Sequence, residues 1–340
     1  MKTILRLATL ALAVAAALAL AGNAFATQRI AVSQTATALK LDLSQDQSDP
    51  QPAKIAVYVP ASYQLHPTGA VGSTIGTTSG QVFATDPTLN IPLPLSGDVI
   101  VLDPAQHTTD RCSPGSHVAV WDLHLTVAGQ AIDLPVYISA TTGAETALGA
   151  AKIETCLGPT DVPAGTPGRS PNGAKLLSAT FTVNNQVTPP VSSTRWTSLW
   201  TPYASGTGVP NPAGTVEARS IVGPGAATIF GKITNRKRKL LQITGRVTQG
   251  GIGVAGIRVQ LLINSKARFR ATTQSNGGYA FRLRNTNRRK TTTFFQAVVS
   301  AAARDITATG CASPSVPTAK CVSATAGPFT ARSRKLRVRL

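Results

Sequence analysis

The feature that most restricts the fold of this chain is an alternation of apolar and polar residues in its last third. Residues 257–263 read Ile-Arg-Val-Gln-Leu-Leu-Ile, residues 279–284 read Tyr-Ala-Phe-Arg-Leu-Arg, and residues 335–340 read Lys-Leu-Arg-Val-Arg-Leu. Successive side chains of a β-strand point to opposite faces, so a period of two gives each segment one apolar and one basic face. We therefore expect a β-sandwich with an apolar core and a basic exterior.

Residues 27–222 also favour strands over helices. Prolines interrupt this region too often for long helices, because proline cannot continue an α-helix beyond its first turn. The single modest helix candidate is 144–154. The expected strands are 54–59, 98–102, 117–127, 132–138, 176–183 and 216–222. The predicted fold class is all-β, with two β-sandwich domains.

Charge divides the chain in two. Residues 27–222 hold 9 Lys and Arg against 13 Asp and Glu, a net charge of −4. Residues 223–340 hold 22 Lys and Arg against a single acid, Asp305, a net charge of +21. The change coincides with the turn-rich segment Gly-Pro-Gly-Ala at 223–226. We therefore expect two domains of opposite charge, over 27–222 and 223–340.

The first 26 residues have the pattern of a bacterial signal peptide. Lys2 and Arg6 precede the apolar run 7–20, and small residues at Ala24 and Ala26 suit the cleavage site. We expect cleavage after Ala26 and a secreted or envelope-associated protein with no transmembrane segment. A retained anchor is the alternative, although the apolar run is shorter than the roughly 20 residues that a span needs.

The cysteines predict disulfide bonds. Cys112, Cys156, Cys311 and Cys321 are an even number in a chain expected to be exported. Two lie in each expected domain, so we expect the local pairs Cys112–Cys156 and Cys311–Cys321. A zinc site is the alternative, but the Cys-x-x-Cys spacing of structural zinc sites is absent from the sequence.

Part of the basic region resembles the carboxypeptidase regulatory-like domain. The resemblance rests on Gly245-Arg-Val, on Gly253-Val-Ala-Gly-Ile-Arg-Val-Gln-Leu and on Ala271-Thr-Thr-Gln-Ser-Asn-Gly-Gly-Tyr-Ala-Phe, within residues 241–300. The family has an Asp-Gly-x-Tyr/Phe-x-Phe hairpin where this chain has Asn276 followed by two glycines. The resemblance implies a small, prealbumin-like sandwich with a carbohydrate-binding-like fold, used as a non-catalytic accessory domain in secreted proteins. Residues 27–222 resemble no family in this way.

One group of polar side chains in the first region is dense enough to suggest chemistry. His-Glu-x-x-His is absent, and His117 and His124 are an odd number of positions apart, on opposite faces of one expected strand. Asp122 and His124 share a face, although a solvated strand face beside a disulfide loop explains them as well. We therefore assign no catalytic residue, no metal ligand and no cofactor, and keep a hydrolase in 27–222 as the alternative function. The group comprises Asp103, His107, Asp110, His117, Asp122 and His124.

Three aromatic residues form a candidate glycan platform. In an extended strand Trp196 and Trp200 point the same way, and Tyr203 follows closely. Stacked indoles can bind the apolar face of a sugar ring. The alternative is a buried core strand, which is where tryptophan in a sandwich usually lies.

The basic region is expected to contact an anionic partner. Nucleic acid is not the expected partner, because the aromatic residues here occupy core positions and an exported protein seldom meets nucleic acid. An anionic envelope polymer, polysaccharide or phospholipid surface suits the compartment better, with a merely solvated basic face as the alternative. The candidate polyanion-binding residues are Arg258, Arg282, Arg284, Arg337 and Arg339, and further cations lie at Lys232, 236–239 and 288–290. The sequence thus predicts a secreted, non-catalytic binding or scaffold protein of two domains.

Overall fold

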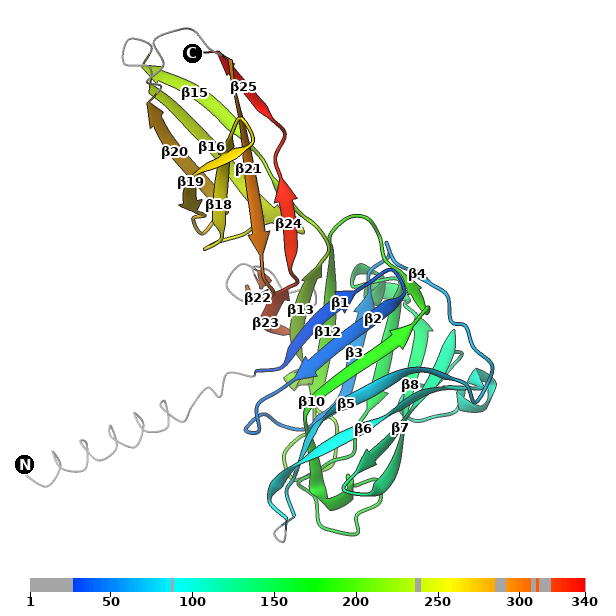
Figure 1. Cartoon of the computed structure of the whole chain (residues 1–340). Coiled ribbons are helices and arrows are strands. Elements are labelled where there is room, and N and C mark those ends of the chain that lie inside the picture. The colour runs from blue at the N-terminus through cyan, green and yellow to red at the C-terminus, as the bar shows by residue number, and fades with distance from the viewer. Residues whose placement is uncertain are drawn as a thin grey trace, which may run out of the picture.

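The computed structural model describes residues 27–86, 89–235, 240–284, 292–306, 310–311 and 319–339. These residues are nearly all in strands and loops, which confirms the all-β fold class (Figure 1). The expected signal peptide, the basic runs 236–239 and 288–290, and Leu340 lie outside the described residues. Within the described ranges, no helix has the length and apolar character needed to cross a membrane.

Thirteen strands form one sheet that folds over on itself around the first hydrophobic core. Two short strands, β4 (Gln64–Leu65) and β11 (Val187–Thr188), pair separately, and four short 3-10 helices, η1 (Pro104–His107), η2 (Gly143–Ala147), η3 (Pro171–Gly173) and η4 (Pro212–Gly214), lie in its loops. In the order of neighbours, the sheet contains β1 (Arg29–Gln34), β2 (Ala38–Ser44), β10 (Ala174–Asn184), β5 (Thr74–Ala84), β6 (Ile91–Leu102), β7 (Ala119–Val127), β8 (Gln130–Ala140), β9 (Ala151–Cys156), β3 (Pro52–Val59), β12 (Thr194–Pro202), β13 (Val216–Val222), β23 (Lys320–Ala326) and β22 (Arg304–Asp305).

The two ends of this sheet meet along β1. The Val32 amide donates a hydrogen bond to Ser220 Oγ of β13 over 2.9 Å, and Thr325 Oγ1 of β23 donates to the Ile30 carbonyl over 2.8 Å. Hydroxyl side chains thus satisfy backbone groups that an open edge strand would leave unpaired. We call this closed body the first sandwich.

A second, smaller sandwich extends from one end of the first (Figure 1). Its core packs side chains such as Ile243 and Phe281 of one sheet against Val259, Leu261 and Val299 of the other. The first of its sheets contains β14 (Gly225–Ala227), β15 (Phe230–Asn235), β16 (Leu240–Gln249), β17 (Ile252–Gly253) and β20 (Gly278–Arg284). The other, the β18 sheet, contains β19 (Lys266–Thr272), β18 (Arg258–Ile263), β21 (Thr292–Ala301), β24 (Phe329–Arg332) and β25 (Leu336–Arg339).

The chain crosses between the sandwiches more than once. After β21 it returns to the first sheet, where β23 pairs in parallel with β13 and β22 pairs with β23, before β24 and β25 complete the second sandwich. A division of the chain at 222/223 separates the two cores, but it assigns β22 and β23 to the wrong sheet. Their weak apolar alternation gives no sign of a pairing with a strand about 100 residues earlier in the sequence.

One local expectation is also wrong. The helix candidate 144–154 is the short helix η2 followed by the strand β9, because Ile153 is needed in the first core and the pair of Tyr58 and Lys152 belongs to the β3–β9 ladder. The chain does turn tightly at Asn276 and Gly277, where the Gly277 amide donates to the Gln274 carbonyl over 2.8 Å. The strands on either side belong to different sheets, since β19 pairs with β18 whereas β20 pairs with β16. Gly277 has a φ of +78°, a conformation that a side chain would strain.

Candidate functional site

A polar cluster fastens the 103–118 loop to the outer face of the first sheet. His107 Nδ1 donates to Asp110 Oδ2 over 2.7 Å, and the Tyr137 hydroxyl of β8 donates to the same oxygen over 2.7 Å. These hydrogen bonds, that from His107 above all, hold the pKa of Asp110 below its usual value. Both donors stabilise the charged carboxylate, so the loop is held by charge-assisted hydrogen bonds.

His117 and a disulfide complete this attachment. His117 Nε2 lies 3.3 Å from the His107 carbonyl, and Nδ1 lies 2.9 Å from Ser139 Oγ. The carbonyl can only accept, so His117 Nε2 carries a proton and donates it. The bond between Cys112 and Cys156 ties the loop to β9, and the partner bond joins Cys311 to Cys321, which confirms both expected disulfides.

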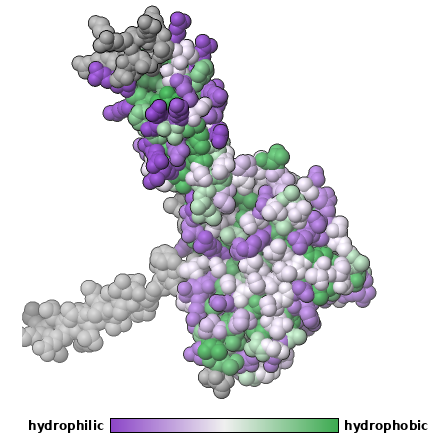
Figure 2. Space-filling model, in the orientation of Figure 1, coloured by the Kyte–Doolittle hydropathy of each residue, from purple (hydrophilic) through white to green (hydrophobic). Residues whose placement is uncertain are grey.

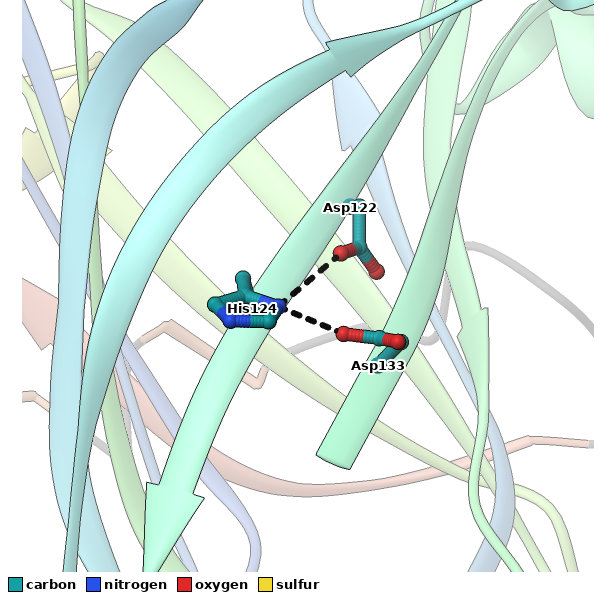
Figure 3. Close-up of side chains that lie close together, drawn as sticks. All are labelled: Asp122, His124 and Asp133. Atoms are coloured by element: carbon teal, nitrogen blue, oxygen red, sulfur yellow. Dashed lines mark hydrogen bonds and ion pairs between the residues drawn. The ribbon is translucent and has the colours of Figure 1, made fainter. Parts of the chain in front are cut away.

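A second cluster lies on the same outer face, on the hairpin of β7 and β8 (Figure 3). His124 Nδ1 is 2.6 Å from Asp133 Oδ1 across the hairpin and 4.0 Å from Asp122 Oδ2 on its own strand. One potential ligand atom from each of these residues falls within 4.8 Å of the other two. Two carboxylates and one imidazole therefore converge from neighbouring strands.

Asp122 and its two neighbours differ in exposure. Asp122 is 8% exposed, whereas His124 and Asp133 are exposed to solvent. Asp122 Oδ1 is buried without a hydrogen-bond partner among the described residues. Burial raises the pKa of the Asp122 carboxyl above its usual value, and the charge of Asp133 raises it further.

The side chains that the sequence groups together do not meet in one place. Asp103 caps η1, accepting a hydrogen bond from the Ala105 amide over 3.0 Å. His107 pairs with Asp110, and Asp122 with His124 forms the other cluster. Five of the six side chains therefore divide between two clusters, with His107, Asp110 and His117 in one and Asp122 and His124 in the other.

Asp133 is the site residue that sequence reasoning misses. A turn at Ala128 and Gly129 places His124 directly opposite Asp133, because the two positions are equally far from the turn. The expected strands 117–127 and 132–138 contain both residues, but only the exact position of the turn between them gives this register.

The prediction of a glycan platform is wrong. Trp196 and Trp200 do share a face of β12, but it is the inner face, and their exposed fractions are 0% and 1%. Trp196 packs edge-on against Tyr63, with ring centroids 4.9 Å apart. Tyr203 is half-buried and donates to the Leu157 carbonyl over 2.5 Å. No sugar can stack on rings that lie within the core.

The five candidate arginines are all exposed, and they lie on two opposite faces of the second sandwich. Arg282 and Arg284 point outward from β20, because Phe281 and Leu283 pack in the core. The other three, Arg258, Arg337 and Arg339, point outward from the β18 sheet. The five therefore do not form one patch.

The β18 sheet carries further cations that complete its outer face. One row across it runs Arg270, Gln260, Val298 and Arg332, and Arg258 stands opposite Thr272 near the same row. Strands are about 4.8 Å apart, so Arg270 and Arg332 project from backbones about 14 Å apart. We call Arg258, Arg270, Arg332, Lys335, Arg337 and Arg339 the basic face.

A hollow of about 450 Å³ lies at one end of the basic face. Lys335, Gln296 and the 44%-exposed ring of Phe294 line it, together with the turn at Asn264 and Ser265. Phe294 stands directly opposite Arg337 in the β21–β25 ladder. The hollow thus brings the Phe294 ring and the Gln296 amide together with one cation, Lys335. Figure 2 shows strongly hydrophilic residues over much of the second sandwich, whereas large parts of the first are paler.

Comparison with known proteins identifies no family. No family model matches the chain, and no curated protein matches it. Among solved structures, the chain is similar to the tetra-tandem repeat in the extending region of a large adhesion protein, at 8% identity and a TM-score of 0.25, with 93% of this chain and 99% of that chain covered. A TM-score this low supports no argument about fold or function.

Proposed function

We propose that this protein is an exported, non-catalytic binding module of a bacterial cell envelope, in which the basic face of the second sandwich contacts anionic polymers. The observation that carries the proposal is the basic face itself. Its six cations project from one sheet, and the single acid of 223–340, Asp305, lies in the first sheet, where it pairs with Arg29 at 2.8 Å. No carboxylate of the second sandwich is therefore available to neutralise these cations.

The alternation of residues along each strand keeps the charged side chains on the outside of this sandwich and out of its core. Arg258 alternates with the core residues Val259 and Leu261, and Arg337 alternates with Leu336 and Val338. An exposed guanidinium keeps its hydration until a polyanion approaches, so the fold bears no desolvation penalty for it. Each contact is screened over about 8 Å at physiological salt, and affinity must come from several contacts together.

Two disulfides support the expected export, because such bonds persist in oxidising compartments. Teichoic acids, lipopolysaccharide and acidic polysaccharides all repeat a negative charge along a chain, which suits a row of cations. Binding is expected to weaken steeply as salt is added.

The test compares two triple variants that remove the same charge. Arg258→Gln/Arg332→Gln/Arg337→Gln changes the basic face, whereas Lys232→Gln/Arg282→Gln/Arg284→Gln changes exposed cations of the opposite sheet. The full chain and both variants are loaded on heparin and on immobilised teichoic acid and eluted with salt. We expect the wild type to be retained at low salt and the first variant to elute at clearly lower salt than the second.

Two results would contradict the proposal. Flow-through of the wild type at low ionic strength would mean that the basic face is only solvated. Equal losses in the two variants would mean that net charge alone attracts the polymer and that the β18 sheet has no special role.

A further inference from the structure

The cluster of Asp122, His124 and Asp133 has no structural task that accounts for it. The other His–Asp pair, His107 with Asp110, attaches a loop to the sheet, because the Tyr137 hydroxyl of β8 donates to the same carboxylate. The hydrogen bond between His124 and Asp133 fastens no loop, because it joins two strands whose ladder is already complete. Within the described residues, no Lys or Arg forms an ion pair with its carboxylates.

We propose that Asp122, His124 and Asp133 bind a divalent transition-metal ion of the zinc type. Imidazole nitrogen and carboxylate oxygen are common zinc ligands, and three protein ligands leave a fourth position open. Calcium and magnesium prefer sites made of oxygen atoms alone, so the imidazole favours zinc over these ions.

The unpartnered oxygen of Asp122 is an independent sign of a missing ligand. A buried carboxylate oxygen without a hydrogen bond is costly, and native proteins usually explain one by a water molecule or an ion. Asp122 is 8% exposed, and its carboxylate points toward His124 and Asp133 (Figure 3). The buried aspartate thus supplies a fixed ligand on the protein side of the site.

The distances suit an ion after a small movement. In a tetrahedral site two atoms that are each about 2.1 Å from zinc lie about 3.4 Å apart. His124 Nδ1 is 4.0 Å from Asp122 Oδ2, so this pair would have to approach slightly to share an ion. The 2.6 Å contact of His124 with Asp133 is a hydrogen bond that metal ligation would replace. The Asp133 side chain is 68% exposed, so it can rotate without disturbing the core. The open position faces solvent and would hold water or an oxygen of a partner.

The experiment measures Zn²⁺ binding to the untagged full chain after removal of metal with a chelator. Isothermal titration with Zn²⁺ is run on the wild type and on His124→Gln, Asp133→Asn and Asp98→Asn, with Ca²⁺ as a parallel titrant. Asp98 is the matched control, because it is exposed and lies directly opposite His124 on β6 but is not one of the three ligands.

We expect saturable binding of one Zn²⁺ that weakens by about tenfold or more in His124→Gln and Asp133→Asn and by less than about threefold in Asp98→Asn. Zinc should also shift the His124 imidazole signals in proton NMR spectra and leave those of His107 unchanged. The altered side chains are exposed, so both ligand variants are expected to keep the wild-type fluorescence melting curve.

Absence of saturable binding would overturn the proposal. Equal losses in Asp98→Asn and Asp133→Asn would overturn it as well, because they would indicate diffuse attraction by acidic charge. Calcium binding as tight as zinc binding would exclude ligation through the imidazole.

Discussion

The two sandwiches use the outward positions of their strands differently. In the second sandwich, outward arginines such as Arg258 and Arg282 are exposed. In the first sandwich, outward positions of β9 and β13 hold Glu154 and Glu217, which are only 3% and 0% exposed. Both follow the same alternation, with Ile153 and Ala218 facing the core. An outward position is therefore not the same as an exposed one.

The outward side chains of the first sandwich are buried because other segments of the chain cover them. The 103–118 loop lies over β8 and β9, tied there by Cys112 and Cys156. On β13, Glu217 pairs with the Nε of Arg219, whose Nη1 donates to the Gly310 carbonyl over 2.7 Å. Polar groups placed under cover must find partners inside the protein, whereas the bare faces of the second sandwich leave theirs in water. The covered face thus keeps its polar groups paired inside the protein, whereas the bare faces leave theirs open to solvent.

Breaking the buried ion pair is the strongest test of this comparison. Glu217→Ala leaves the Arg219 charge buried without its carboxylate, which typically costs about 3–5 kcal/mol. Urea unfolding followed by tryptophan fluorescence measures the loss, because all three tryptophans, including Trp121, lie in the first core.

The bare-face control for that test is Arg282→Ala. This side chain is exposed on the second sandwich, and its removal should leave the fluorescence transition unchanged. A loss below about 1 kcal/mol for Glu217→Ala would mean that water reaches Arg219 and that the cover is not effective.

Removing the disulfides is expected to cause the next largest loss of stability. The bond between Cys112 and Cys156 spans 44 residues, and that between Cys311 and Cys321 spans 10. On the loop-entropy model, replacing the first pair by alanine costs about 4 kcal/mol and the second about 3 kcal/mol. Both losses should appear in the same tryptophan transition, since both bonds fasten segments to the first sandwich. A loss confined to the second sandwich, seen by hydrogen exchange, would contradict the placement of the second bond.

A smaller difference between the two sandwiches is expected in how their stability depends on acid pH. The pKa of Asp110 is lowered in the folded state, so its charge stabilises the first sandwich above the unfolded pKa near 3.8, and this contribution is lost as the pH falls through the folded value. Asp110→Asn should therefore destabilise the first sandwich at pH 7, and the difference from the wild type should shrink as the pH falls below 3.8 towards the lowered pKa of Asp110. The strands of the second sandwich contain no carboxylate side chain, so hydrogen exchange there should change little between pH 5 and pH 3 once its intrinsic pH dependence is corrected. Equal acid sensitivity of both sandwiches would contradict this.

The sequence predicts the strands and faces of the second sandwich better than those of the first. Strands 257–263 and 279–284 are found where alternation places them, as β18 and β20. In the first sandwich, Trp196 and Trp200 were recognised as sharing a face, yet a shared face can be inner or outer. The choice depends on which side of β12 the rest of the sheet folds over, and no local pattern records that.

The sequence by itself determined the strand content, the two local disulfides and the division of charge. Each of these depends on residues close together in the chain or on composition, and the relevant physics is alternation, loop closure and charge. Only the tertiary structure decided that β23 joins β13, that Asp122 is buried, and that Asp133 lies beside His124. These outcomes depend on the pairing of strands that are distant in the sequence and on the loops that cover them. Such contacts form only when the sheets assemble, so no local pattern in the sequence encodes them.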